Sequence, residues 1–427
     1  MSAPNWPCEK YRGQQPKYEF ESEATINSPA VLAYNGNMAR LTCRTAGESH
    51  GPASIALIEG FPADLMLDIH FINTQLKRRQ GGYGRGGRQK IESDEVEFLA
   101  GVRNGVTTGA PIVVQIINKD SRLNDAEATP PVHRPRPGHA DLAGALKWLT
   151  NDCRNTLERA SARETAARTA AGAIARCLLR EFDIHAFGFV SGAMDVKANI
   201  SPTVDNWEKL LEARDDSAVY CPDDATCKAI IEHIRNAKVD KDTVGGFCEV
   251  HVFGCPPGLG SCVAWQDKLD SRLAGAVMGI QAFKAVEIGI GKTCGTLRGS
   301  QVHDPIEYSE ENIAQTNLGY DRPTNHAGGI EGGMTNGMPI VVHGTMKPIA
   351  TLLQGMDSVD LKTGKPSRSD YERSDVCALP AASVVMENAV GFEIASAFLE
   401  TFSGATMAMI HASHSAYTEL ARKISST

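Results

Sequence analysis

The alanine-rich stretch at residues 155–182 places the strongest constraint on how this chain of 427 residues folds. Its apolar residues recur at i, i+3 and i+4, which is the spacing of a single buried helical face. That face comprises Ala166, Ala170, Ala173, Ile174, Cys177 and Leu178. Because alanine side chains are small, a neighbouring element can approach such a face closely. The sequence therefore predicts a long helix that is suited to close burial.

A second long helical pattern follows Pro380, and short β-branched runs alternate with the helical patterns along the chain. One face of the second helix carries Val384, Asn388, Phe392, Ala395 and Leu399. Residues 223–238 predict a further, exposed helix. Strands are expected at residues 54–58, 111–117, 247–253, 286–290 and 339–343. Periodicity alone is also compatible with a doubly wound α/β protein.

The first 37 residues differ in character from the rest of the chain. They contain four prolines and scattered polar residues, and they lack a periodic apolar face. They also lack the basic and apolar regions of a signal peptide, and they are too acidic for a usual transit peptide. We therefore expect residues 1–37 to be a poorly ordered N-terminal extension without a targeting function. No Ser/Gly-rich linker divides residues 38–427, which we expect to form a single domain.

The composition excludes several classes of protein. Lys and Arg number 43 and Asp and Glu number 51, so the net charge of −8 argues against a general nucleic-acid binder. Apolar-rich stretches such as residues 111–117 are too short to cross a bilayer, and no membrane crossing is expected. Eleven cysteines without a CxxC pair indicate reduced thiols and a cytosol-like compartment. Cys221 and Cys227 have zinc-like spacing, but no second pair accompanies them, so no metal site is expected.

The segment at residues 77–90 is strongly basic, with the sequence KRRQGGYGRGGRQK. Its glycines match GxGxxG, the pattern of a dinucleotide-binding loop in an NAD(P)-dependent oxidoreductase. That fingerprint needs a preceding strand, however, and residues 68–79 instead resemble a capped amphipathic helix. An RGG-like RNA contact and a solvated loop are further alternatives. The fourth is a pocket for a small polyanion, because arginine binds carboxylates and phosphates through two parallel hydrogen bonds.

Four other segments combine groups that bind anions or transfer protons. They are GESHG at residues 47–51, HRPRPGHAD at 133–141, ERASARET at 158–165 and ERSDVC at 372–377. A histidine beside arginines can donate a proton to an anion near neutral pH. If residues 158–165 were helical, Arg159 and Arg163 would project from one face. Each segment also has a purely structural interpretation, as a turn, a helix cap or a surface ion pair.

Taken together, these segments resemble the chorismate synthase family over residues 38–402. The motifs occur in the family's order, and they also include GVTTGAP, KAVEIG, RGS, NHAGGIEGG and KP. The resemblance implies an α+β fold, a β-α-β sandwich in which antiparallel sheets enclose a helical core. It also implies one catalytic domain over residues 38–427 and a homotetramer. The activity that it implies is an anti 1,4-elimination of phosphate from 5-enolpyruvylshikimate 3-phosphate, which gives chorismate.

The resemblance also implies roles for individual residues. The substrate-binding residues would be Arg79, Arg85, Arg136 and Arg163. His50 would protonate the departing phosphate. The family uses a reduced flavin as cofactor. His139 would donate a proton toward N1 of this flavin, and Asp375 would act through Ser49 on the proton at its N5.

The implied cofactor is reduced FMN, which is required although the reaction has no net redox change. By resemblance it would contact Arg159, Ala160, Ser161, Gln281, Ala282, Gly332, Lys347, Pro348, Ile349, Ala350, Thr351 and Arg373. Some members of the family also reduce flavin with NADPH. No separate reductase domain is evident in this sequence, so an external supply of reduced flavin is expected. We expect a cytoplasmic enzyme with a small-molecule substrate and without nucleic-acid or membrane partners.

Overall fold

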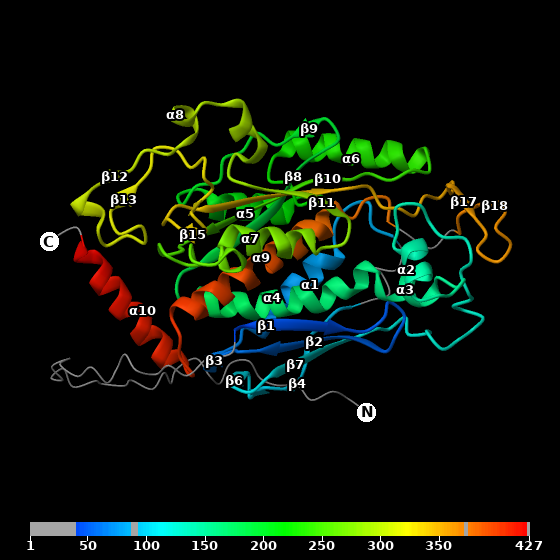
Figure 1. The fold of residues 1–427 in the computed structure, drawn as a ribbon, viewed down its shortest axis with the longest axis horizontal. Helices are drawn as coiled ribbons and strands as arrows, with labels where there is room; N and C mark the ends of the chain where they lie inside the picture. Colours follow the sequence, from blue (N-terminus) through cyan, green and yellow to red (C-terminus); the bar gives the residue numbers. More distant parts are fainter. Residues whose placement is uncertain (1–39, 87–92, 371–374, 425–427) are drawn as a thin grey trace. The chain divides into compact units, whose positions relative to one another are not determined.

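A layer of helices lies between two antiparallel sheets in the computed structural model, which describes residues 40–86, 93–370 and 375–424 (Figure 1). The first sheet has the strand order β1 (Thr42–Ala46), β2 (Ala53–Glu59), β7 (Ile112–Ile117) and β4 (Glu97–Ala100). The second has the order β11 (Phe283–Ile288), β16 (Ile340–Met346), β10 (Gly246–Phe253), β8 (His185–Ala193) and β9 (Val196–Lys197). Contacts group residues 38–427 into one compact unit.

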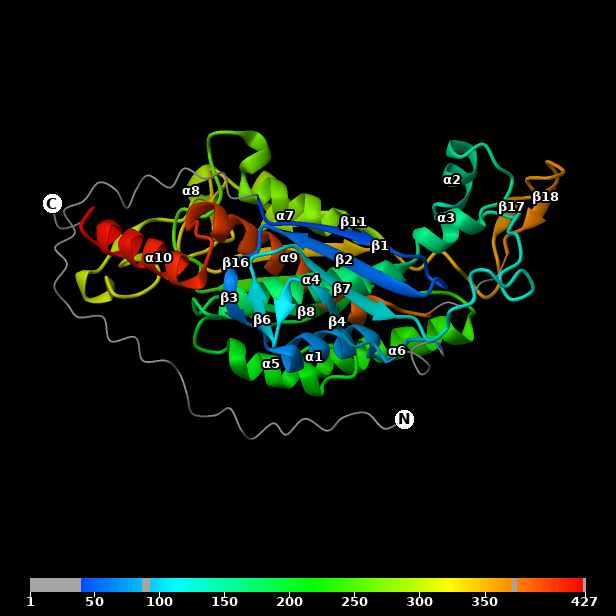
Figure 2. The same ribbon diagram turned by 90° about the horizontal axis from the view of Figure 1, so that it is seen from below.

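The central helical layer is built on α4 (Thr165–Arg180) and α9 (Leu379–Thr401), with α1 (Ile69–Gln80) and α7 (Leu269–Met278) beside them. Figure 2 shows the first sheet in front of α4 when the molecule is seen from below. Helix α4 contacts β1, β2 and β7 of this sheet, while α9 contacts β8, β10 and β16 of the other. The two long helices thus connect the inner faces of the two sheets.

The approach of α4 to α9 is close enough to require glycine at one position. A Cβ atom on Gly172 would lie 2.2 Å from the main-chain oxygen of Asn388. Helix α9 is buried on nearly every side, which explains why its sequence is apolar all round. It is long and apolar enough to cross a membrane, but 89% of its most apolar window is buried inside the protein. Its composition is therefore that of a core helix.

The predicted α+β class and antiparallel sheets are confirmed, and the doubly wound alternative is wrong. Every strand pair within the two main sheets is antiparallel. The five predicted strands correspond to β2, β7, β10, β11 and β16. The predicted exposed helix is α6 (Asp224–Val239), although its Ile230 and Ile234 are buried. Strand β8 was not predicted, because its residues are buried almost throughout and so lack a period of two.

The long helix predicted for residues 155–182 is interrupted. The chain forms α3 (Arg154–Arg159) and a 3-10 turn at Ala162–Glu164 before α4 begins. Ser161 adopts an extended conformation between them, and its side chain accepts a hydrogen bond from the amide of Arg163. As a result Arg159 is exposed and Arg163 is buried, so these arginines do not project from one face. The expectation that they would share a face, which depended on a continuous helix, is wrong.

The remaining elements lie around the central layers. The other helices are α2 (Asp141–Lys147), α5 (Trp207–Asp216), α8 (Gly299–Val302) and α10 (Met407–Arg422). A small sheet has the order β3 (Ala63–Met66), β6 (Val106–Thr108) and β5 (Val102–Arg103). Three hairpins pair β12 (Glu307–Tyr308) with β13 (Tyr320–Asp321), β14 (Ile330–Glu331) with β15 (Met334–Thr335), and β17 (Asp357–Val359) with β18 (Pro366–Arg368). Figure 2 shows α2, α3, β17 and β18 together at one end of the central helices.

Candidate active site

The turn between β1 and β2 holds Ser49 and His50, and both side chains are buried. Gly47 begins this turn with a φ of +108°, and a Cβ atom there would lie 2.3 Å from the main-chain oxygen of Ala53. Glycine is therefore required for the chain to reverse so tightly. The Ser49 amide donates to the main-chain oxygen of Glu158, and the Ser161 hydroxyl lies 3.1 Å from that of Ser49. Predicted catalytic and cofactor-binding residues thus meet at this turn.

His50 is held by the buried carboxylate of Glu158. Its Nδ1 lies 3.0 Å from each carboxylate oxygen, and its backbone amide donates to Oε2 at 2.9 Å. Burial opposes ionisation of Glu158, but the hydrogen bonds from His50 outweigh it and lower the pKa of this carboxyl. On the other side of the ring, Nε2 lies 3.4 Å from an Arg122 nitrogen and 3.8 Å from Asp120 Oδ2.

Arg79 and Arg163 converge on one carboxylate, that of Asp94. Arg79 donates to Asp94 Oδ2 at 2.7 Å, and Arg163 NH1 lies 2.7 Å from both oxygens. Burial opposes ionisation of Asp94, but the two guanidinium groups lower its pKa. Arg163 Nε also donates to Asn118 Oδ1 at 2.6 Å, and Asn118 donates to the main-chain oxygen of Gly51. This network connects both arginines to the His50 turn.

A second histidine centre forms where α2 begins. Asp141, which is fully buried, accepts from Arg136 Nε at 2.8 Å and lies 2.5 Å from His139 Nδ1. Burial disfavours the charged form of Asp141, yet His139 and Arg136 hold its pKa far below the usual range. Arg136 also donates from NH1 to Thr351 Oγ1 at 2.8 Å. One carboxylate thus fixes a predicted proton donor and a predicted substrate-binding arginine.

Arg85 and Asp375 form the third pair. The Arg85 guanidinium lies 2.6 Å from one Asp375 oxygen, and the Gly86 amide donates to the other at 2.6 Å. The amide of Val376 also donates to the main-chain oxygen of Gly84. These contacts bring the basic loop against the start of α9. Arg373 lies outside the described residues.

Most of the residues predicted to hold the cofactor belong to two neighbouring groups. Arg159 donates to the main-chain oxygens of Thr45 and Gly47, and Ala160 follows it at the end of α3. The Gln281 amide nitrogen donates to Glu164 at 3.1 Å. Thr45 and Glu164 both line a cavity of about 530 Å³ beside β1, α4 and α9.

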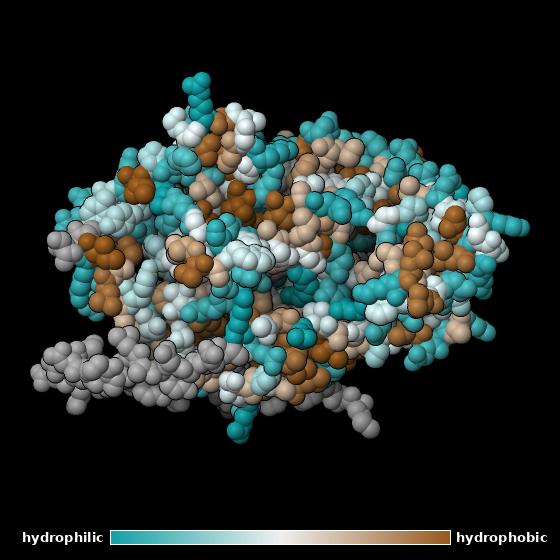
Figure 3. Space-filling view, viewed as in Figure 1, coloured by the Kyte–Doolittle hydropathy of each residue, from teal (hydrophilic) through white to brown (hydrophobic). Residues whose placement is uncertain are grey.

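The second group surrounds residues 347–351. The Lys347 amide donates to the main-chain oxygen of Ala282. The Lys347 ammonium group contacts the main-chain oxygen of Gly138, next to His139. Burial lowers the pKa of Lys347, and nearby Lys284 lowers it further. Pro348 packs at Gly245, Ala350 lies beside Gly138, and the main-chain oxygen of Ile349 accepts from Thr243. Hydrophilic residues line a hollow between the central helices and the end that carries α2 (Figure 3).

Gly332 is placed apart from these groups. It occupies the turn between β14 and β15 with a φ of +62°. The next residue, Gly333, accepts hydrogen bonds from the amides of Ser261 and Leu269. Within the described part of the chain, the contacts of this turn are thus with residues 260–269, at the start of α7.

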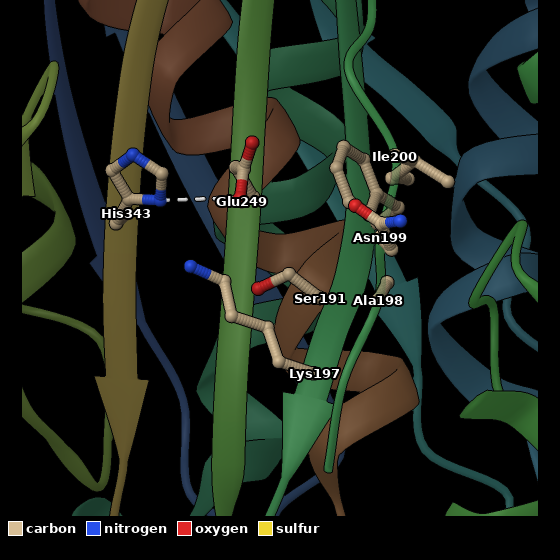
Figure 4. Close-up of a pocket in the computed structure, with 8 residues that line it drawn as sticks. Ser191, Lys197, Ala198, Asn199, Ile200, Glu249 and His343 are labelled. Atoms are coloured by element: carbon tan, nitrogen blue, oxygen red, sulfur yellow. Dashed lines mark ion pairs between the residues drawn. The ribbon is translucent and has the colours of Figure 1, made fainter.

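A separate cavity of about 440 Å³ lies on the outer face of the second sheet (Figure 4). Glu249 lies in it, with His343 Nδ1 at 3.2 Å from Oε2 and His251 Nε2 at 2.7 Å from Oε1. Burial opposes ionisation of Glu249, but the two histidines lower its pKa to about 2. None of the residues predicted for catalysis lines this cavity. In the described ranges, no group of three or more His, Cys, Asp or Glu side chains is arranged to hold a metal ion.

The sequence did not single out Asp94, Asn118, Asp120, Arg122, Asp141 or Glu158. Two of them lie inside recognised motifs, since Glu158 begins ERASARET and Asp141 ends RPGHAD. Their function as partners of histidine was missed because those partners depend on the fold. Asp94, Asn118, Asp120 and Arg122 lie outside the quoted motifs, and no spacing in the sequence indicates their contacts.

Comparisons with known proteins agree on one family. The family model of chorismate synthase matches residues 41–399. Chorismate synthase of Desulforamulus reducens is 50% identical over 392 residues, which cover 89% of this chain and 99% of the relative. The enzyme of Desulforudis audaxviator is 49% identical, with 88% and 97% covered. A crystal structure of chorismate synthase superimposes with a TM-score of 0.73 at 36% identity, covering 90% of this chain and 99% of that one.

Proposed function

The chain belongs to the chorismate synthase family of lyases, and we propose that it eliminates phosphate from 5-enolpyruvylshikimate 3-phosphate to form chorismate. The observation that carries this proposal is the convergence of Arg79 and Arg163 on Asp94, in a network that extends to the His50 turn. The network combines buried cations with a proton donor, which is what elimination of a phosphate requires.

The charge of the substrate explains the buried arginines. Two carboxylates and a phosphate carry roughly four negative charges near neutral pH, and transferring them from water is costly without paired cations. The exposed fractions of Arg79, Arg136 and Arg163 are 4%, 7% and 7%. The buried Nε atoms of Arg79 and Arg85 have no hydrogen-bond partner within the described ranges, so each can still donate. These side chains would therefore bind and orient the substrate.

The proton-transfer groups follow from the same geometry. His50 would donate a proton to the departing phosphate, and Arg122 beside its Nε2 would stabilise the charge of that phosphate. His139 would donate a proton toward the cofactor. Asp375 and Ser49 would act together on the proton at flavin N5. Arg85 holds one oxygen of Asp375, so this carboxylate has a fixed orientation.

The hydrogen-bond donors and acceptors of these residues fit reduced FMN. The buried Gln281 Oε1 has no hydrogen-bond partner in the part of the chain that the structure describes, so it can accept from a ligand. Lys347, Arg159 and Ser161 offer donors suited to a phosphate. When bound, the reduced flavin supplies electron density as the phosphate leaves. Gly332, Arg373 and the backbone of residues 348–351 would complete the site.

An anaerobic assay tests the proposed reaction. We expect the protein, incubated with 5-enolpyruvylshikimate 3-phosphate and photoreduced FMN, to release inorganic phosphate and chorismate in equal amounts. The flavin should remain reduced over each turnover. An oxidoreductase that used GGYGRGG would instead change the redox state of a nicotinamide, and an RNA-binding protein would show neither product. Absence of phosphate release in the presence of reduced FMN would overturn the proposal.

We propose that the enzyme acts in the cytoplasm as a homotetramer, with residues 38–427 as its one catalytic domain. Its partner would be the small-molecule substrate, without nucleic-acid or membrane partners. Reduced FMN would come from an external reductase rather than from NADPH bound to this chain.

Replacing Arg79 by alanine should mainly weaken substrate binding. A hydrogen bond to a charged group contributes about 1.5–3 kcal/mol, so KM should rise roughly 10- to 150-fold with a smaller change in kcat. Steady-state kinetics measure both values. Arg180→Ala is the control, because Arg180 pairs with Asp68 on the surface and should leave KM unchanged. An unaltered KM in Arg79→Ala would contradict the assigned role.

A further inference from the structure

The two predicted proton donors share an arrangement that the resemblance did not supply. Each histidine directs Nδ1 at a carboxylate that is almost completely excluded from solvent. Glu158, which faces His50, is 1% exposed, and Asp141, which faces His139, is 0% exposed. The two pairs come from different parts of the fold, since Glu158 lies on α3 and Asp141 begins α2. The same pairing of histidine Nδ1 with a buried carboxylate thus occurs at both histidine centres.

We propose that Glu158 and Asp141 are positioning residues for the elimination, each holding Nδ1–H of its histidine so that the transferred proton is carried on Nε2. This inference rests on the proposed function. Neutral imidazole has one protonated nitrogen, and the hydrogen bond at one nitrogen decides which it is. A carboxylate accepts but cannot donate when ionised, so it selects the tautomer with hydrogen on Nδ1.

At His50, the carboxylate holds the main chain as well as the ring. Glu158 Oε2 accepts from the His50 amide at 2.9 Å, and its main-chain oxygen accepts from the Ser49 amide at 3.0 Å. The turn and the imidazole plane are therefore fixed together. Arg154, at 3.4 Å from Glu158, supports the charged carboxylate. Asp120 and Arg122, both from the segment after β7, are charged groups that face Nε2.

The proton transfer balances with the carboxylate unchanged. The imidazolium of His50 gives its Nε2 proton to a phosphate oxygen as the bond from carbon to that phosphate breaks and its electron pair leaves with oxygen. The Nδ1 proton stays on the ring, hydrogen-bonded to Glu158. His50 ends as the neutral tautomer that Glu158 favours, so the proton is lost from Nε2 rather than from Nδ1.

At His139, one carboxylate orients two groups. Asp141 accepts from Arg136 Nε, from its NH2 at 3.1 Å and from its amide at 3.1 Å, and it also faces His139 Nδ1. Arg136 NH2 lies 3.0 Å from His139 Nδ1, but both atoms are donors when Nδ1 carries hydrogen. Since Asp141 Oδ1 is an acceptor for both, it resolves this competition. Asp141 is thus the acceptor that sets the spacing of the arginine and the histidine.

Nitrogen-15 spectra of histidine test the proposal without relying on activity. Ligand-free protein labelled at histidine nitrogens would be titrated as wild type, Glu158→Gln and Asp141→Asn. The lost negative charge should move the titration midpoint of the facing histidine down by about one pH unit or more. Glu249→Gln is the matched control, because Glu249 also pairs with histidines but lies in the outer cavity (Figure 4). It should leave both midpoints unchanged.

Kinetics give the second readout. In Glu158→Gln and Asp141→Asn, kcat should fall more than tenfold while KM changes less, and the alkaline limb of the kcat profile should move to lower pH. Glu158→Asp and Asp141→Glu restore the charge and should restore the position of that limb, even where the longer or shorter side chain reduces kcat. These variants also guard against misfolding of the amide variants.

The outcomes separate the two proposals. Midpoints and pH profiles that match wild type in both amide variants would overturn the positioning roles, even if kcat fell. If the midpoints shift in the amide variants but the wild-type protein releases no phosphate, the proposed function is contradicted and the carboxylate–histidine pairs remain supported. Shifted midpoints together with shifted kcat profiles would support both.

Discussion

His50→Ala should lower kcat by about 10²- to 10⁴-fold while KM changes by much less. Proton donation by a positioned side chain contributes a factor of this size, and it acts as the bond to phosphate breaks rather than when substrate binds. Phosphate release under anaerobic conditions with reduced FMN measures the effect. His139→Ala should show the same pattern, because its assigned proton transfer also belongs to the reaction step.

Two further variants serve as controls for the loss of turnover in His50→Ala. His50→Gln can still donate to Glu158 but cannot carry an acidic proton, so it should lose turnover without leaving the buried carboxylate unpaired. His185→Ala removes a histidine that pairs with the exposed Asp183, and its turnover should equal that of wild type. Near-normal turnover in the alanine variants of both His50 and His139 would contradict the proton-donor roles.

Much of the fold was accessible from local sequence patterns. The strands that alternate or carry β-branched residues were found, and so were α1, α6 and α9. The wrong or missing predictions concern segments whose sequence pattern is compatible with more than one structure. The alanines of 155–182 satisfy a helical pattern throughout, yet Ser161 caps a turn and divides the segment. Strand β8 is buried on both faces, which removes the alternation that identifies a strand.

The candidate site was accessible mainly through family motifs. Arg79, Arg163 and His50 could be named from those motifs, but their partners could not. Glu158 lies 108 residues from His50, and Asp94 lies 69 residues from Arg163. Local spacing carries no information about contacts at such separations, because they form only when β1, α3 and α4 pack. The carboxylates that orient the cationic groups are therefore properties of the fold.

A buried charge cluster joins the helices of the core. Glu387, in the middle of α9, is fully buried and accepts from Arg78 and Arg176 at 2.9 Å and from Arg214 at 3.4 Å. Arg78 lies on α1, Arg176 on α4 and Arg214 on α5. One carboxylate therefore joins four helices and offsets the repulsion among three buried cations.

Glu387→Gln should destabilise the protein by about 3–5 kcal/mol at pH 7, because removal of one partner leaves buried charges uncompensated. Burial opposes ionisation of Glu387, but the three arginines lower its pKa from 4.5 to about 2. The contribution of a depressed carboxyl is complete above its unfolded pKa and is lost as pH falls toward the folded value. The difference between wild type and variant should therefore be constant above about pH 4.5 and shrink toward pH 2.

Urea unfolding of both proteins between pH 7 and pH 3 measures this difference. Glu393→Gln provides a control on the same helix, since its partner Arg272 keeps a second carboxylate, Glu400. That variant should lose less than about 1 kcal/mol. A Glu387→Gln variant as stable as Glu393→Gln, or a difference that does not shrink in acid, would show that hydrogen bonding rather than charge holds the four helices at this point.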